Sequence, residues 1–457
     1  MNRARSGKTA SLLLAVGLAL GVLGTAAACN SDDSASGDGD GVVTITVNAL
    51  PPETEEVNRK NYLADVAEFE KKYPKIKIDA REGKMDPKTF STKLAGGQLE
   101  DVFYVYFTDP AQLIAKRQTA DITPYLKDFP IVDQIKPDLM KVFKDANGKV
   151  YGLPWTNYTL GLLYNRAVFT KAGLDPNKPP ATWAEVRDAA KKITALGDGH
   201  IGYGDYSKNN TGGWHFTAEL YSVGGDIATK DGDTWKAAFN NDKGKQVLQQ
   251  LYDMRWTDNT MGDKQLLEYA DLLTMMGSGK LGMYVAAADN IPTIVNQYKG
   301  NYNDYGLGPI PGGQATLGGG EAFMFNAKAS PAKIKAGLTW LTWNYTNPDR
   351  AGVDFQRRAA DKVPVGLPQP NLYTGKAEET YLAAVKQYGN VPTQNYAPFV
   401  DSATRIPLKV EPPAAQQIYA VLDTAMQGVL TDRNANIDKL LSDAEKQVNQ
   451  ILAAQPK

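Results

Sequence analysis

The sequence is poor in the residues that form disulfides and hold metals, with one cysteine and two histidines in 457 residues. A single thiol cannot form an internal disulfide or supply a thiolate cluster for a metal. His200 and His215 stand outside any HExxH pattern, the spacing that places two imidazoles on one face of a helix around zinc. The sequence therefore predicts no metal site and no cofactor.

Nucleotide-binding and catalytic motifs are also missing. Gly279-Lys280 resembles part of a phosphate-binding loop, but Thr274 stands where that loop needs its first glycine, and Leu281 where it needs Ser or Thr. The glycine run 318–320 lacks the third glycine of a dinucleotide fingerprint. No Gly-x-Ser-x-Gly nucleophile elbow occurs. These absences favour a protein that is not an enzyme.

Neither sign of charge is in excess, because 50 basic residues stand against 51 acidic ones and the net charge is −1. This balance predicts no nucleic-acid partner. The hydrophobic content of 42% and charged content of 22% are typical of a soluble globular protein. A chain of this length is too long for one ordinary core, so two domains are expected.

The longest apolar stretch, at residues 11–24, follows three basic residues near the N-terminus and precedes small residues and Cys29. This pattern is typical of a secretory signal peptide, here residues 1–28. Cys29 resembles the diacylated cysteine of a bacterial lipobox, although Ala26 replaces the usual Leu. Acyl chains on Cys29 would anchor the chain to a membrane. The alternatives are an uncleaved anchor helix and a signal peptide followed by an unmodified thiol.

Residues 29–41 are then expected to be a lipidated cysteine with a flexible tether, because the segment is rich in Ser, Asp and Gly and cannot bury apolar surface. After it, the pattern changes to alternating strands and helices. A strand at 43–47, a helix at 55–73 and a strand at 76–78 predict a βαβ unit with parallel strands. The apolar run 102–107 predicts a strand covered on both faces.

The segment 151–173 is central to the predicted organisation. It begins with Gly152-Leu153-Pro154, continues with polar and aromatic residues to Tyr158, and then has an apolar run at 160–164 and a short helix that ends at Gly173. This order indicates a strand that crosses from one lobe to another, followed by the first buried strand and helix of the second lobe. Thr182 and Glu185 form a predicted capping box at the start of a further helix.

Aromatic residues beside turns are the clearest functional signal, notably Trp155, Tyr158, Trp214 and Tyr284. Core packing is the ordinary role of such rings. A Trp next to two glycines at the start of a helix, as at 214, is less easily explained by packing alone. The flat apolar faces of sugars stack on such rings, while Asp, Asn and Glu bind the hydroxyl groups. No charged cluster of the kind that an anionic ligand needs stands out.

Several short motifs occur in one order along the chain: Phe-Glu-Lys-Lys-Tyr-Pro at 69–74, Gly-Gln-Leu-Glu-Asp-Val at 97–102, Gly-Lys-Val-Tyr-Gly-Leu-Pro at 148–154, and Leu-Tyr-Asn-Arg-Ala-Val-Phe at 163–169. Together they resemble the family 1 extracellular solute-binding proteins, the maltose-binding-protein-like sugar receptors of ABC importers. Two departures concern the ligand. Glu100 replaces the family's Pro, and the loop at 288–292 has no Trp, so maltodextrin is not the expected sugar.

The resemblance implies an α/β fold of type II with two lobes, joined by several hinge crossings, and a ligand cleft between them. The expected lobes are 42–155 with about 316–350, and 156–315 with about 351–457. The residues expected to line the cleft, by position in the family, are Glu53, Thr54, Tyr106, Thr108, Asp109, Trp155, Asn157, Tyr158, Trp214, Asp289, Asn290, Gly320 and Glu321.

The function that the resemblance implies is capture of a mono- or oligosaccharide and its delivery to the permease subunits of an ABC importer. The expected protein is a monomer, lipid-anchored to the outer face of the cytoplasmic membrane, and its lobes close over the ligand. A receptor for a polyol, a peptide or a polyamine is the alternative. A secreted carbohydrate-active enzyme is a third hypothesis from a different class.

The lipobox interpretation predicts that Cys29→Ser will release the protein from the membrane fraction into the medium, because no acyl chain would then hold the tether. Immunoblots of cell and medium fractions measure this, and Ser31→Ala serves as the control. Retention of Cys29→Ser on the membrane would contradict the anchor.

Overall fold

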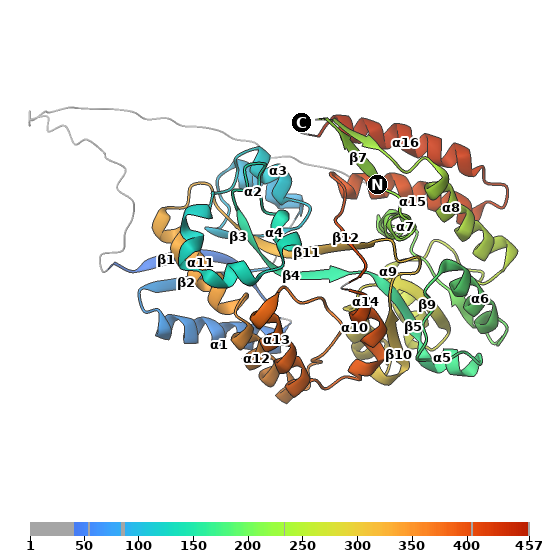
Figure 1. Ribbon diagram of the computed structural model, residues 1–457, viewed down its shortest axis with the longest axis horizontal. Helices are drawn as coiled ribbons and strands as arrows, with labels where there is room; N and C mark the ends of the chain where they lie inside the picture. The colour runs from blue at the N-terminus through green and yellow to red at the C-terminus, as the bar shows by residue number, and fades with distance from the viewer. Residues whose placement is uncertain (1–40, 54, 84–86, 233, 404, 456–457) are drawn as a thin grey trace, which may run out of the picture. The chain divides into compact units, whose positions relative to one another are not determined.

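The computed structural model describes residues 41–53, 55–83, 87–232, 234–403 and 405–455, and Figure 1 shows the arrangement of helices and strands. The predicted signal peptide, Cys29, the tether up to residue 40 and Thr54 lie outside the described residues. From residue 42 onward the chain contains both helices and strands, as the sequence predicts for an α/β fold, and the part after residue 330 is mainly helical.

The first sheet contains the strands predicted near 43–47, 76–78 and 102–107. Its order is β12-β11-β3-β1-β2, and β4 pairs with β11. β1 (Val43–Leu50) pairs in parallel with β2 (Ile76–Glu82) and with β3 (Val102–Tyr106), and α1 (Glu56–Lys72) connects the first two. The predicted βαβ unit is confirmed. Because β1 and β3 run in the same direction, their carboxyl ends lie at one edge of the sheet.

The core of this sheet is rich in aromatic residues. Trp340 of α11 (Pro331–Asn344) is fully buried and makes edge-to-face contacts with Phe69, at 5.0 Å between ring centroids, and with Tyr62, at 5.9 Å. Both partners belong to α1. Edge-to-face pairs of this kind add about 0.5–1.5 kcal/mol to the stabilisation from burial itself. They fix α1 against α11.

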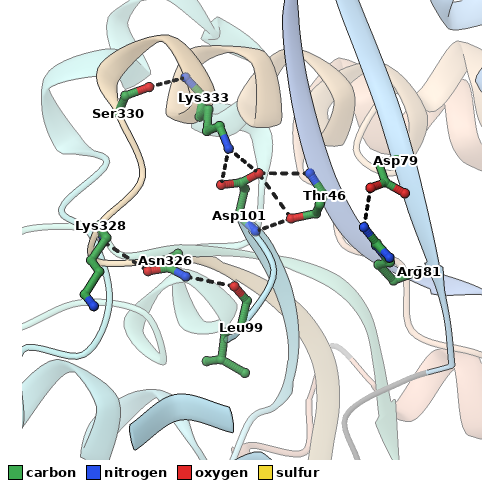
Figure 2. A network of polar contacts seen from close by, with 9 residues as sticks. All are labelled: Thr46, Asp79, Arg81, Leu99, Asp101, Asn326, Lys328, Ser330 and Lys333. Atoms are coloured by element: carbon green, nitrogen blue, oxygen red, sulfur yellow. Dashed lines mark hydrogen bonds and ion pairs between the residues drawn. The ribbon is translucent and has the colours of Figure 1, made fainter. Parts of the chain in front are cut away.

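A polar network around Asp101 joins three elements of the first sheet, as Figure 2 shows. The Asp101 carboxylate accepts hydrogen bonds from the Thr46 backbone N–H (3.0 Å) and hydroxyl (3.1 Å) of β1, and from Lys333 Nζ (2.9 Å) of α11. The Asp101 N–H donates to Thr46 Oγ1 at 2.8 Å. Ser330 caps α11 beside this network, since its hydroxyl oxygen accepts from the Lys333 N–H. Asp101 thus fixes the start of β3 to β1 and α11.

The second sheet has the order β10-β5-β9-β6. Its strands are β10 (Tyr305–Gly308), β5 (Gly161–Asn165), β9 (Leu281–Ala286) and β6 (Ile201–Tyr203). Successive side chains of β5 point to opposite faces, so Leu162 enters one hydrophobic cluster and Leu163 another. Both faces of this sheet are therefore covered, which explains the unbroken apolar run in the sequence.

Two strands connect the sheets. β4 (Gly152–Thr159) pairs antiparallel with β11 (Thr316–Phe325), from Thr159 opposite Gly318 to Gly152 opposite Met324. β4 then continues through Leu160 into β5 of the second sheet, and Figure 1 shows it running between the two sheets. The crossing strand predicted within 151–173 is confirmed.

β11 begins at Thr316, so its first half includes the run of three glycines at 318–320. These positions in the strand require glycine, because their neighbours leave no room for a side chain. A Cβ on Gly319 would lie 2.5 Å from the Tyr158 hydroxyl, and a Cβ on Gly320 2.4 Å from the carbonyl oxygen of Thr156. Three glycines in succession look like a turn in the sequence, but here they permit close packing.

The segment after residue 350 differs from the expected division into lobes. The expected second lobe includes about 351–457. In the structure, α12 (Pro348–Ala360) packs on α13 (Gly375–Tyr388), and Leu372, Tyr373 and Ala377 belong to the core of the first sheet. Tyr396 and Phe399, by contrast, pack with the second sheet. An amphipathic helix pattern identifies the buried face but not the sheet that covers it, so the sequence could not settle this boundary.

The other elements flank or connect the two sheets. Thr182 and Glu185 form the predicted capping box at the start of α6. Beside the first sheet lie α2 (Pro87–Ala95), α3 (Pro110–Ala115), η1 (Thr123–Asp128), η2 (Pro130–Gln134) and α4 (Pro137–Lys141). The remaining elements are α5 (Arg166–Lys171), α6 (Trp183–Thr194), α7 (Thr211–Ser222), β7 (Ala228–Asp231), β8 (Thr234–Ala237), α8 (Asp242–Tyr252), η3 (Asp253–Thr257), α9 (Tyr269–Gly277), α10 (Asn290–Tyr298), η4 (Tyr302–Asp304), η5 (Thr393–Tyr396), α14 (Ala397–Ser402), β12 (Leu408–Lys409), α15 (Ala415–Thr431) and α16 (Ile437–Ala453).

Asp101→Ala is predicted to lower the free energy of unfolding by about 2–4 kcal/mol, because it leaves the half-buried Lys333 ammonium and the Thr46 N–H without their acceptor. Urea denaturation measures the change. Asp138→Ala is the matched control, since the Asp138–Lys141 pair is exposed and its loss should change stability by less than about 0.5 kcal/mol. Equal stability of the two variants would contradict the role of Asp101.

Candidate functional site

A cavity of about 710 Å³ lies where the end of β1 meets the crossing strand. Its walls come from residues 49–52 at the end of β1, residues 155–157 of β4, α1, α12 and the loop 369–373. This volume falls within the range of small-molecule sites, which are about 300–1,000 Å³. The position at the carboxyl end of a parallel strand is where ligands bind in open α/β folds.

The walls of this cavity combine aromatic rings with side-chain amides. The rings offer apolar surfaces, and each amide offers both a donor and an acceptor. The aromatic residues are Tyr62, Trp155, Tyr345, Phe355, Tyr373 and Tyr381. The amide residues are Asn58, Asn61, Asn157, Asn344, Asn347, Gln369 and Asn371. Such a lining suits a ligand with apolar faces and many hydroxyl groups.

Asn157 is the most informative polar residue of the cavity. It is 4% exposed, and within the described part of the chain its Oδ1 accepts no hydrogen bond. A buried acceptor without a partner costs about 1–3 kcal/mol, so a ligand that donates a hydrogen bond here would recover that energy. β4 fixes the residue, because Asn157 pairs with Gly320 of β11.

Trp155, two residues earlier on the same strand, presents an aromatic wall to the cavity. Its ring centroid lies 5.3 Å from that of Tyr345 and 5.7 Å from that of Phe323. These contacts hold the ring in one orientation, which reduces the entropy that a stacking ligand would lose. Both Trp155 and Asn157 are candidate residues from the sequence, and among the candidates in the described part of the chain they are the two that line this cavity.

A second set of candidate residues lies where the end of β3 pairs with the middle of β11. Tyr106 pairs with Glu321 across the two strands, and the Phe107 N–H donates to the carbonyl of Gly320 at 3.0 Å. Asp109 Oδ2 accepts a hydrogen bond from the Tyr106 N–H at 2.9 Å. Burial raises the pKa of Asp109 to about 6, and the Tyr106 hydrogen bond only partly opposes this.

Tyr158 and Trp214 extend this second set. Their ring centroids lie 6.4 Å apart in an edge-to-face arrangement, and Trp214 also stacks on His215. Burial raises the pKa of the Tyr158 hydroxyl, and the charges of Glu411, Asp289 and Glu321 raise it further. These three carboxylates belong to separate segments of the chain.

The loop before α10 positions Asp289 and Asn290 differently. Asp289 is exposed and precedes the helix, whereas Asn290 is 5% exposed. Asn290 Oδ1 accepts hydrogen bonds from the hydroxyls of Tyr284 (2.9 Å) and Tyr206 (3.4 Å), and its Nδ2 donates to Asp289 Oδ1 (3.1 Å). Asn290 thus holds Asp289 in place. Glu53 and Thr108 are exposed in the loops after β1 and β3, outside the cavity lining.

Glu411 is a candidate that the sequence analysis missed. It lies between β12 and α15, and its Oε1 accepts a hydrogen bond from the Tyr419 hydroxyl at 3.1 Å. Burial raises the pKa of Glu411 to about 7, and the charge of Asp109 contributes to the increase. An isolated Glu before two prolines carries no motif, so only the folded chain reveals its burial and its bond to Tyr419.

The cavity residues on α12 and in the loop 369–373 were also missed. These residues belong to the segment after residue 350, which was expected in the other lobe. Their position beside β4 was therefore not predictable from the expected division into lobes. Within the described residues, no group of three or more His, Cys, Asp or Glu side chains is arranged to hold a metal ion. Nor does the described part of the chain contain a helix sufficiently long and apolar to cross a bilayer.

Two sheets joined by paired crossing strands, with a polar and aromatic cavity beside the crossing, define the two-lobed class of periplasmic binding folds. A family model described as "Bacterial extracellular solute-binding protein" matches residues 54–350, and the chain belongs to this family. The resemblance inferred from the short motifs, and the fold that it implies, are thereby confirmed. The family description also implies an extracytoplasmic location.

Two curated relatives are similar to part of the chain. A binding protein of Brucella abortus is 30% identical over 188 residues, 40% of this chain and 43% of the relative. The sn-glycerol-3-phosphate-binding periplasmic protein UgpB of the same species is 28% identical over 216 residues, 44% of this chain and 46% of the relative. The chain thus spans less than half the length of the curated relatives it matches.

Two solved structures are similar over almost the whole described chain. The solute-binding protein of an ABC transporter from Thermotoga lettingae, bound with α-D-tagatose, is 24% identical with a TM-score of 0.67, and 90% of this chain and 99% of that chain align. The cyclic α-maltosyl-1,6-maltose binding protein from Arthrobacter globiformis is 22% identical with a TM-score of 0.70, over 91% and 100%. At these identities the likeness establishes the fold.

The raised pKa of Asp109 predicts how Asp109→Asn changes stability with pH. The native carboxyl holds its proton up to about pH 6, whereas the unfolded chain releases it near the ordinary pKa of 3.8. The native state therefore loses stability, relative to the variant, by about 1.4 kcal/mol per pH unit as the pH rises from about 4 to about 6. Urea denaturation of both proteins at about pH 4, 5, 6 and 7 measures the difference in their free energies of unfolding.

Asp133→Asn is the control, since Asp133 is exposed, and it should show no such trend. If Asp109→Asn and the wild type change in parallel from pH 4 to 6 (about two units), the carboxyl is not held protonated by burial.

Proposed function

We propose that this protein is the extracytoplasmic receptor of an ABC importer and that it binds a mono- or oligosaccharide without catalysing a reaction. The observation that carries the proposal is the cavity at the crossing strand, where aromatic rings and side-chain amides surround a buried Asn157 oxygen that bonds no described residue. Rings that stack on sugar faces, with amides for the hydroxyl groups, are the recognition chemistry of sugar sites.

The similar structures support the sugar as the ligand class. The Thermotoga protein is bound with a monosaccharide, and the Arthrobacter protein is named for a cyclic maltosyl-maltose. The permease of an ABC importer is the partner proposed from the family. We propose further that Cys29 is acylated after cleavage of the signal peptide, that 30–41 tethers the protein to the membrane, and that it acts as a monomer.

The structure also suggests how the two lobes divide the site. We propose that residues 42–155 with about 318–390 form one lobe, and that residues 156–317 with about 391–457 form the other. The cavity then belongs mainly to the first lobe and to the crossing strand, whereas Trp214, Asp289 and Glu411 belong to the second. Closure would bring the second set of candidate residues toward a sugar held in the cavity.

Asn157→Leu is predicted to weaken sugar binding by about 10- to 100-fold, the loss of one buried hydrogen bond, because Leu preserves the size of the side chain but removes the acceptor. The free energy of unfolding should stay equal or rise, since the variant no longer buries an unpaired oxygen. Isothermal titration calorimetry with neutral sugars that raise the unfolding midpoint of the wild type measures affinity, and urea denaturation measures stability.

Thr159→Val is the matched control. It makes a similar polar-to-apolar change on β4, at a position that is buried but outside the cavity lining. Unchanged affinity in Asn157→Leu, or an equal loss in both variants, would contradict the assignment of the cavity. If no sugar shifts the wild type but a peptide or polyamine does, the ligand class itself is wrong.

A further inference from the structure

The charged residues that line the cavity indicate which ligands it selects, and the aromatic rings and amides do not. Two arginines, Arg350 and Arg358 of α12, line the cavity, together with Glu55, Asp65 and Asp354. A guanidinium in a ligand cavity ordinarily indicates a site for phosphate or carboxylate, because its fork of donors matches those groups. Whether either arginine is available to an anion depends on its existing partners.

The Arg350 guanidinium forms ion pairs with two carboxylates of α1. Its NH1 donates to both oxygens of Glu68 at 2.8 Å, and its NH2 donates to Asp65. The side chains of Arg350 and Asp65 are 10% and 16% exposed, so water screens this pair weakly. The guanidinium also packs over the Trp343 ring at 4.1 Å, which fixes its plane. The positive charge of Arg350 is therefore neutralised inside the protein.

Arg357, one residue before Arg358, strengthens the same network from outside the cavity lining. It donates to Asp65 and, at 3.4 Å, to Glu68, so two arginines and two carboxylates balance one another. Arg358 in turn lies 3.8 Å from Asp354 and donates to the carbonyl of Pro364. Every guanidinium that lines the cavity thus faces a carboxylate.

The charges that remain disfavour an anionic ligand. Among the described residues, three carboxylates and two guanidiniums line the cavity, so this described part of the lining is net negative when all are ionised. Glu55 Oε2 accepts a hydrogen bond from the Asn58 amide. Arg350 and Arg358 each keep a buried Nε–H that bonds nothing among the described residues, a donor suited to a neutral hydroxyl oxygen.

We propose that Asp65 is a specificity-determining residue: by holding Arg350, it makes the cavity select uncharged polyhydroxy solutes and reject phosphorylated ones. This inference rests on the proposed function and concerns the same cavity. It separates this chain from its relative UgpB, whose name gives sn-glycerol 3-phosphate as its ligand. Removing the Asp65 charge leaves the buried Arg350 guanidinium without one of its carboxylate partners. A ligand phosphate could then take the place of that carboxylate.

The experiment compares the wild type with Asp65→Asn and Asp65→Asn/Glu68→Gln, using the full-length chain. Calorimetric titrations use neutral sugars and two anionic probes, glucose 6-phosphate and sn-glycerol 3-phosphate. For the wild type we expect no measurable binding of either anion. Asp65→Asn should gain affinity for the phosphate esters by about tenfold or more, with a larger gain in the double variant, while affinity for the neutral sugar changes by less than about threefold.

Asp79→Asn is the matched control, because it removes one negative charge from an ion pair, Asp79–Arg81, that does not line the cavity. Its anion affinity should equal that of the wild type, which separates a local effect from the change in net charge. Unfolding midpoints of all variants confirm that titrations are made on folded protein. Since Arg350 and Arg357 both keep their ion pairs with Glu68 in Asp65→Asn, this variant retains links between α1 and α12.

Tighter binding of a phosphate ester than of its neutral counterpart by the wild type would overturn the proposal, and so would unchanged anion affinity in both Asp65 variants. Failure of the proposed function would look different. In that case no neutral sugar would bind the wild type at all, whatever the variants do with phosphate.

Discussion

The structure depends on one backbone constraint, the pairing of β4 with β11 as they run between the two sheets. Residues 318–320 of β11 are glycines, whose missing side chains leave room for Leu408, Tyr158 and Phe107 beside the paired strands. The pairing fixes Trp155 and Asn157 on one side of the crossing and Tyr158 on the other. The crossing therefore sets the geometry of both groups of candidate residues, and a wider separation of the strands would displace both at once.

Local sequence patterns predicted most of the fold, since they are tied to the periodicity of each element. The βαβ unit, the buried strand β3, the crossing strand and the capping box of α6 were all expected from short stretches. Two features were not. The start of β11 was hidden because a glycine run has the same appearance in a turn and in a closely packed strand. The placement of α12 and α13 depends on tertiary contacts that no amphipathic pattern specifies.

The candidate site was predictable in part for the same reason. Trp155 and Asn157 stand out because they occupy the crossing strand, and they line the cavity. Glu411 and the α12 arginines carry no motif, and their surroundings come from segments far away in the sequence. Electrostatics is the least predictable property. A net charge near zero for the whole chain gives no sign that carboxylates from three separate segments raise the pKa of Tyr158, or that Arg350 is neutralised by Asp65.

The account therefore depends on where a ligand is held. In this view the crossing strand supplies a rigid wall, the first lobe supplies rings and amides, and the second lobe closes against them. The most direct test is a crystal structure of the full-length chain with a neutral sugar that stabilises it. The account predicts a sugar ring in the cavity, against Trp155 and with a hydroxyl donating to Asn157 Oδ1. A sugar bound elsewhere, with the cavity between β4 and α12 unoccupied, would contradict it.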